Sequence, residues 1–238
     1  MDKTVAQDMN QQLIVEGQHI SNASYAGMQL SRFVSIASNF EDCKFSNMKV
    51  NLATFGGGAN MSVYKGCTFD GSYIRAIAPG SARFENCSFT NIHFPELNCR
   101  KVEFVNCFFS GSIDKGYFTG SVKTPMPNSP DKINEFHGND FRGVDLIDVD
   151  FRCGIDLRLQ KLPTGKQYIY IVEARKFLEK MKSSKLKSVS SNKELISILK
   201  IIESDVLQGQ EQVLLNAHGF SARFQNSIEF IRNVASGL

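Results

Sequence analysis

A repeat of 20 residues organises the middle of this chain. Three segments share an aromatic residue, then two polar or small residues, then Cys-x-Phe, and they align without gaps. The segments are 64–69, 84–89 and 104–109. A fixed period of this size predicts a solenoid, in which stacked units build one continuous core.

A shorter period of five residues lies inside the longer one. A large apolar residue recurs at every fifth position, and a smaller side chain lies two residues before it. The large residues are Tyr64, Phe69, Ile74, Phe84, Phe89, Phe94, Cys99, Phe104 and Phe109. Helices need spacings of three and four, and strands need sustained alternation, so neither has this period. A chain that turns a corner every five residues closes a square coil of 20, with equivalent residues stacked about 4.7–4.9 Å apart.

The units at 139–143, 144–148 and 149–153 resemble the pentapeptide-repeat protein family. The consensus of that family is a small residue, then Asp or Asn, then a central Leu or Phe, then two polar positions. The resemblance implies a mainly β fold, a right-handed quadrilateral β-helix. It extends in phase over most of residues 18–160, where we expect the solenoid.

Two segments interrupt the predicted ladder. The glycine-rich stretch 56–59 lacks the Gly-Lys-Ser/Thr ending of a phosphate-binding loop, so we interpret it as a backbone bulge at a coil corner. Segment 119–135 has three prolines within six residues, which predicts a loop inserted into the solenoid. Residues 1–17 are polar and out of phase, and we expect them to cap the first coil, since an open end presents unpaired strand edges.

Helical spacing replaces the repeat in residues 166–238. Three apolar stripes predict an α-helical appendage that caps the last coil. The stripes comprise Ile169, Val172, Phe177, Leu178 and Met181; Leu195, Ile198, Leu199, Ile202 and Val206; and Phe220, Phe224, Ile228, Ile231 and Ala235. Surplus apolar surface there is a candidate homodimer interface, as the resemblance to the C-terminal pairing of some family members implies.

The six cysteines do not suggest metal or disulfide chemistry. Five fall on inward positions of the five-residue phase, where free cysteine packs as a small hydrophobe, and only Cys153 falls on an outward one. The chain has no Cys-x-x-Cys pair and no histidine at zinc spacing. His19, His93, His137 and His218 are isolated from any nucleophile. We therefore predict a protein that is not an enzyme, with no catalytic residue, metal or cofactor.

Charge is nearly balanced and unevenly distributed. The formal net charge is +3, and residues 166–238 carry 11 Lys and Arg against 7 Asp and Glu. No apolar run approaches the roughly 20 residues of a membrane span, and the N-terminus lacks the apolar region of a secretory signal. We expect a bacterial, cytoplasmic protein without a transmembrane segment and without direct nucleic-acid binding, and export by a signal-independent route stays open.

Three functional hypotheses follow. The first is a non-enzymatic interaction scaffold with a protein partner of unknown identity, because the inward set is complete and the outward set contains no chemistry. The second comes from the resemblance: some family members imitate DNA and bind a type II topoisomerase such as gyrase, which confers quinolone resistance. That imitation needs a strongly negative face. The third is a polyanion- or membrane-surface adaptor that acts through the basic tail. The lysines of that tail are Lys176, Lys180, Lys182, Lys185, Lys187, Lys193 and Lys200.

Candidate partner contacts lie in the loop and in the acidic coil that follows it. The carboxylates at 140, 145 and 150 come just before a central residue, where the family consensus has Asp or Asn for structural reasons, so a purely structural ladder is the alternative. The candidates are Lys123, Met126, Asn128, Asp131, Lys132, Asp140, Asp145, Asp148 and Asp150.

Overall fold

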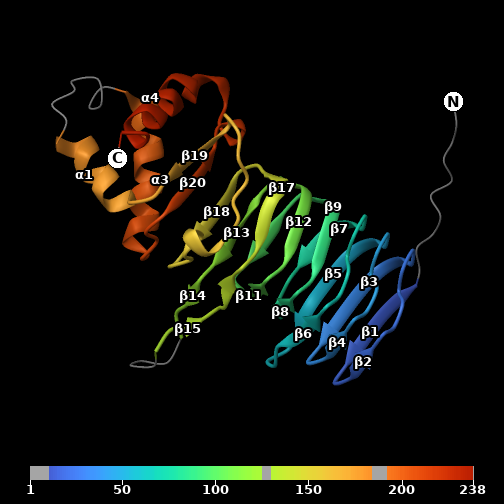
Figure 1. Ribbon diagram of the computed structural model, residues 1–238. Coiled ribbons are helices and arrows are strands. Elements are labelled where there is room, and N and C mark those ends of the chain that lie inside the picture. Colours follow the sequence, from blue (N-terminus) through green and yellow to red (C-terminus); the bar gives the residue numbers. More distant parts are fainter. Residues whose placement is uncertain (1–10, 125–129, 184–191, 238) are drawn as a thin grey trace, which may run out of the picture.

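The structure is a computed structural model that describes residues 11–124, 130–183 and 192–237. Short parallel strands stack along one axis, and the C-terminal helices lie at the end opposite to the first strand (Figure 1). None of the helices in these described ranges is long and apolar enough to cross a membrane. The predicted mainly β solenoid with a C-terminal helical appendage is confirmed.

The longest sheet runs the length of the solenoid. Its seven strands pair in parallel, each with its equivalent one coil away. In spatial order they are β1 (Gln12–Glu16), β3 (Gln29–Ile36), β5 (Lys49–Gly57), β7 (Tyr73–Ala78), β9 (Ser88–Phe94), β12 (Phe108–Ile113) and β17 (Asp140–Leu146).

Shorter ladders form the other sides of the coil. One parallel sheet contains β2 (His19–Ser21), β4 (Asn39–Glu41), β6 (Ser62–Lys65), β8 (Ser81–Glu85), β11 (Lys101–Val105) and β16 (Phe136–His137). A third contains β10 (Leu97–Cys99), β13 (Gly116–Thr119) and β18 (Val149–Arg152). Isolated parallel bridges continue the pattern between neighbouring coils at Ser24, Lys44, Thr68 and Ser88.

Aromatic columns fill the interior at the predicted positions. Tyr64 pairs with Phe84, and Phe84 with Phe104, so partners are 20 residues apart. Their rings stack with centroids 4.8 and 5.1 Å apart, close to the strand spacing. A second column stacks in the same way through Tyr25, Phe45, Phe69, Phe89, Phe109 and Phe141. The five-residue phase is therefore confirmed as the inward pattern.

The inward cysteines form a third buried column. Cys43, Cys67, Cys87 and Cys107 are buried, and each thiol donates to a backbone carbonyl of the preceding coil at 3.3–3.5 Å. Burial raises the thiol pKa of Cys43, Cys87 and Cys99, and the pKa of Cys67 is raised first by its contact with Cys87 and then by burial. These thiols act as packing groups, as the phase predicts.

The glycine-rich stretch does begin at a bulge in the ladder. Val34 pairs with Thr54, whereas Ile36 pairs with Gly57, so β5 has one extra residue between these pairs. A Cβ atom on Gly56 would lie 1.9 Å from the carbonyl oxygen of Ser81 in the next coil. Glycine is required at position 56 because the two backbones meet there.

The first coil begins earlier than the repeat predicts. Strand β1 pairs residue by residue with β3, from Gln12 with Arg32 to Glu16 with Ile36. Residues 12–16 therefore belong to the solenoid and not to a cap over residues 1–17, and residues 1–10 lie outside the described ranges. Val15, which is 4% exposed, and Leu13 in fact continue the five-residue phase one unit before Ile20.

The C-terminal module mixes helices with a two-stranded antiparallel sheet. The strands are β19 (Tyr168–Ile171) and β20 (Val213–Asn216), and the helices are α1 (Ala174–Ser183), α3 (Lys193–Leu207) and α4 (Gln225–Ala235), with short 3-10 turns η1 (Leu157–Leu159), η2 (Ala217–Gly219) and η3 (Ala222–Phe224). The prediction that Ile169 and Val172 lie on a helix is wrong, because Ile169 lies in β19 and Val172 precedes α1, exposed to solvent. The aromatic and β-branched run Tyr168–Ile171 favours a strand over a helix.

Side chains of the module close the end of the last coil. Gln210 accepts from the backbone amides of Gly154 and Ile155 at 3.1 and 3.0 Å, and Gln212 accepts from the amide of Leu157 at 3.1 Å. Tyr168 accepts from the amide of Leu146 at 3.0 Å. These bonds satisfy backbone donors that an uncapped solenoid would leave unpaired.

Truncation of one stacked ring tests the columns. Phe89 is 2% exposed and stacks on rings at 4.8 and 5.0 Å, so Phe89→Ala is expected to lower the free energy of unfolding by about 3–5 kcal/mol. Phe108→Ala is the matched control, because Phe108 points outward and is 42% exposed, and it should change stability by less than about 1 kcal/mol. Urea unfolding measures both; equal losses would contradict the assigned phase.

Thiol titration tests the cysteine column. A thiol reagent is expected to modify one cysteine, Cys153, in the native protein, and all six after unfolding in guanidinium, because the other five are buried. The control Cys153→Ser should abolish the native reaction. A second thiol that reacts as fast as Cys153 would show that the column is open to solvent.

Candidate functional site

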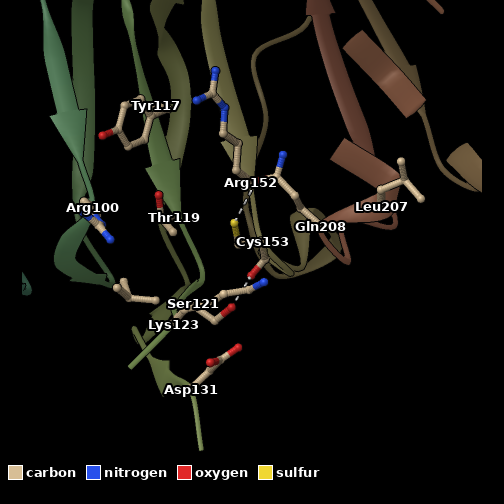
Figure 2. Close-up of a pocket in the computed structure, with 11 residues that line it drawn as sticks. Arg100, Tyr117, Thr119, Ser121, Lys123, Asp131, Arg152, Cys153, Leu207 and Gln208 are labelled. Carbon is tan, nitrogen blue, oxygen red and sulfur yellow. Dashed lines mark hydrogen bonds between the residues drawn. The ribbon is translucent and has the colours of Figure 1, made fainter. Parts of the chain in front are cut away.

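A hairpin interrupts the solenoid where the projecting loop was predicted. Strands β14 (Ser121–Val122) and β15 (Lys132–Ile133) pair antiparallel and extend away from the coils (Figure 1). At the base of the hairpin, the coil corner and the C-terminal end of α3 enclose a cavity of about 580 Å³, which we call the junction pocket (Figure 2). Its walls include Arg100, Tyr117, Lys123, Arg152 and Gln208.

One buried asparagine holds the base of the hairpin. Asn134 donates its side-chain amide to the carbonyls of Arg100 and Thr119 at 2.9 and 2.8 Å, and its backbone amide to Gly120 at 2.8 Å. Gly120 in turn donates to the carbonyl of Arg152 at 2.9 Å. This web ties three separate segments of the pocket wall together, so their backbones are fixed before anything binds.

Three basic side chains, Arg100, Lys123 and Arg152, line the pocket. The guanidinium of Arg152 lies 4.8 Å from the ring centroid of Tyr117 and pairs with Asp150. Within the described ranges, no carboxylate comes within ion-pair distance of Arg100 or Lys123, and both side chains are exposed. The pocket therefore presents unpaired positive charge next to one acidic residue of its wall, Asp131.

Cys153 lies at the centre of the pocket, on an outward position as predicted. Its thiol donates to the side-chain oxygen of Gln208 at 3.6 Å, and its carbonyl accepts from Ser121 at 3.2 Å (Figure 2). Burial raises the thiol pKa, while the charges of Arg152 and Lys123 act in the opposite direction. Cys153 therefore joins the hairpin to α3 through hydrogen bonds, and it is not activated as a nucleophile.

The structure divides the predicted loop contacts. Lys123 and Asp131 line the junction pocket, and Lys132 pairs with Val122 within the hairpin ladder. Met126 and Asn128 lie outside the described residues.

Two of the predicted acidic contacts, both on β17, are engaged by neighbouring side chains. Asp140 is buried, and Arg142 donates to it at 3.0 and 2.6 Å, which lowers the pKa of its carboxyl. Asp145 accepts from Tyr168 at 2.7 Å and from Asn216 at 3.1 Å, so it anchors the C-terminal module.

The two other acidic residues lie on different parts of the coil. Asp150 lies on β18, in another sheet, and pairs with Arg152. Asp148 is exposed in a turn with a φ of 55°, a conformation that Asp and Asn tolerate. Asp140 and Asp145 therefore share β17, whereas Asp150 lies on β18 and Asp148 in the turn between these strands.

Sequence reasoning missed Arg100, Tyr117, Arg152 and Gln208 as site residues. Tyr117 and Arg152 belong to neighbouring coils, in which Thr119 pairs with Arg152 across the inserted hairpin, and Gln208 comes from the module. The usable signal is the break in the repeat at 119–135, because residues that flank an insertion at a coil corner are brought together by stacking. Among the described residues, no group of three His, Cys, Asp or Glu side chains is placed to hold a metal ion.

A second cavity of about 350 Å³ adjoins the junction pocket and shares Arg152 and Gln208 with it. Asp205 lines this cavity and is buried in the last turn of α3. Desolvation, and secondarily the charge of Asp150, raises the pKa of Asp205 to about 6, and Arg152 opposes the shift. The negative end of the helix dipole also disfavours a carboxylate there.

Asp205 is expected to make the protein less stable as pH rises. The pKa of Asp205 in the folded protein, about 6, lies above its usual value of about 4. Ionising the buried carboxyl therefore costs stability, and this loss is absent below about pH 4 and complete above about pH 7. Asp205→Asn should raise the free energy of unfolding at neutral pH, on the order of 1 kcal/mol, and flatten its pH dependence in that window. Urea unfolding at both ends of the window measures the difference, and Glu16→Gln, at an exposed site, is the control. An equal gain at both pH values would contradict the assignment.

Comparison with known proteins gives a structural likeness but no match in sequence. No protein-family model matches the chain, and neither does any curated protein. Among solved structures, the chain is similar to QnrB1, a plasmid-mediated fluoroquinolone resistance protein, at 15% sequence identity and a TM-score of 0.30, over 63% of this chain and 93% of that one. The fold is assigned from the chain's own repeat and strand register, and the likeness adds nothing to it.

Three observations define that fold. A large side chain points inward at every fifth residue, equivalent residues pair 20 positions apart, and parallel sheets run along the stack. The chain folds as a parallel β-solenoid that turns its side chains inward with a period of five residues, and it ends in a C-terminal helical module.

Proposed function

We propose that this chain is a non-enzymatic protein-interaction scaffold whose partner binds around the junction pocket and the hairpin. One observation carries the proposal: the web of hydrogen bonds from Asn134 fixes an exposed hairpin to a rigid solenoid beside the C-terminal module. A projecting element with a rigid base loses little entropy when it binds.

Exposed apolar side chains support this location. Ile133 on the hairpin is 74% exposed and Leu207 at the end of α3 is 81% exposed. Exposed large apolar side chains that are flanked by polar residues are typical of protein-binding surfaces. The solenoid interior, by contrast, is filled by its own side chains, so the binding surface must lie on the outside.

The two other hypotheses make different demands on the chain. Topoisomerase binding by imitation of DNA requires a continuous acidic face. Asp140, Asp145 and Asp150 are each paired or hydrogen-bonded within the chain, so this alternative depends on the hairpin. An adaptor that works through the basic tail would use lysines of which Lys176 and Lys182 already pair with Glu173 and Glu203. Lys185 and Lys187 lie outside the described residues.

Affinity capture from the native host tests the scaffold proposal. Ile133→Asp and Leu207→Asp, at exposed positions, should each remove the partner that the wild-type protein captures, because they place a charge in an apolar contact. Ile14→Asp is the matched control, since Ile14 is 54% exposed on the first strand, at the far end of the solenoid. Mass spectrometry identifies the partner.

The outcomes separate the hypotheses. A partner lost with both junction variants and kept by the control supports the proposal. Retention by all three variants, or loss with the control alone, would place binding elsewhere and overturn it. Recovery of a type II topoisomerase would favour the second hypothesis, whereas capture that fades steeply with salt and ignores all three variants would favour the basic tail.

A further inference from the structure

The junction pocket has the size of a small-molecule site. Its volume of about 580 Å³ lies within the range of about 300–1,000 Å³ that is typical of such sites. Four parts of the chain supply the walls: the end of β10, the strands at the hairpin base, the end of β18 and the end of α3. A ligand there would contact segments that are far apart in the sequence.

The charges around the cavity are mainly positive. Arg100, Lys123 and Arg152 line it together with one acidic residue, Asp131. Arg100 and Lys123 have no carboxylate within ion-pair distance in the part of the chain that the structure describes. Among the described residues, Arg152 pairs with Asp150, lies over the ring of Tyr117 and also feels the charge of Asp205. Guanidinium and ammonium groups in this state form strong charge-assisted hydrogen bonds with oxyanions.

These cations are held by a pre-organised frame. The carbonyl of Arg100 accepts from Asn134, and the carbonyl of Arg152 accepts from Gly120, which is itself bonded to Asn134. Figure 2 shows Arg100 and Arg152 on opposite sides of Thr119, with Lys123 below them. Because the backbone positions are set in advance, binding needs to order only the side-chain ends.

We infer that the junction pocket binds a small polyanion, a ligand that carries two or more phosphate or carboxylate groups, through Arg100, Lys123 and Arg152. A multiply charged ligand is favoured because three cationic side chains line one cavity of about 580 Å³, so several anionic groups can be paired there at once. The inference goes beyond the proposed function: it concerns the same pocket, but it requires no protein partner.

Calorimetric titration of the full chain with inorganic pyrophosphate and with citrate tests the inference. At low ionic strength at least one of them should bind, and added salt should weaken the binding. Arg100→Gln and Lys123→Gln should each weaken it about ten-fold, the loss expected for one charge-assisted contact. Arg75→Gln is the matched control, because Arg75 is an exposed arginine on β7, away from the pocket.

The results divide cleanly. Pyrophosphate binding identifies phosphate groups and citrate binding identifies carboxylates, and either supports the inference when the junction variants lose it and the control keeps it. If neither probe binds, or if all variants bind as the wild-type protein does, the inference is wrong. Melting temperatures within a few degrees of wild type show that the variants are folded, which is expected for exposed side chains.

The same reagents separate this inference from the scaffold proposal. Polyanion binding without any captured protein would leave the inference standing and remove the scaffold role. If the protein captures a partner that Ile133→Asp abolishes, and neither probe binds, the scaffold proposal stands and the polyanion inference is wrong.

Discussion

Contact between side chains 20 residues apart is the interaction on which the whole structure depends. Each coil pairs through its backbone and through stacked rings only with the coils before and after it, so one five-residue unit has no core of its own. Each added coil adds stability along the axis. Extra residues that break the five-residue phase must therefore leave the coil where they are inserted, so that the next coils stay aligned. The glycine-rich stretch at 56–58 and the hairpin at 121–133 place such extra residues outside the coil. The strands on either side still pair with the neighbouring coils.

The repeat predicted the solenoid well because inward positions are chemically constrained. Phe69, Phe89 and Phe109 had to be large and apolar wherever their coil lay, so their spacing alone gave the phase. The ends of the solenoid were less predictable. Residues 12–16 join the first coil through backbone pairing and hold only one unit of the five-residue phase, Leu13 and Val15, and Tyr168–Ile171 has the spacing of a helix stripe but the residue types of a strand.

The candidate site was only partly predictable, for a related reason. Lys123 and Asp131 were found because they flank an obvious interruption, whereas Arg100 and Arg152 look like ordinary outward residues of regular units. Their proximity arises from stacking and from the hydrogen bonds of Asn134, a residue that no motif marks. Outward positions in a solenoid vary freely, so a site assembled from several coils leaves little trace in a single sequence.

The capped end of the solenoid has a consequence for assembly. Gln210, Gln212 and Tyr168 occupy backbone amides that face away from the last coil, where a further strand would otherwise add. A second copy, or an extended segment of another protein, cannot lengthen the sheets at that end. The C-terminal module therefore prevents strands from adding at its end of the solenoid. Only the edge at the first strand could still pair with another chain, and blocking one end hinders the stacking of copies into filaments.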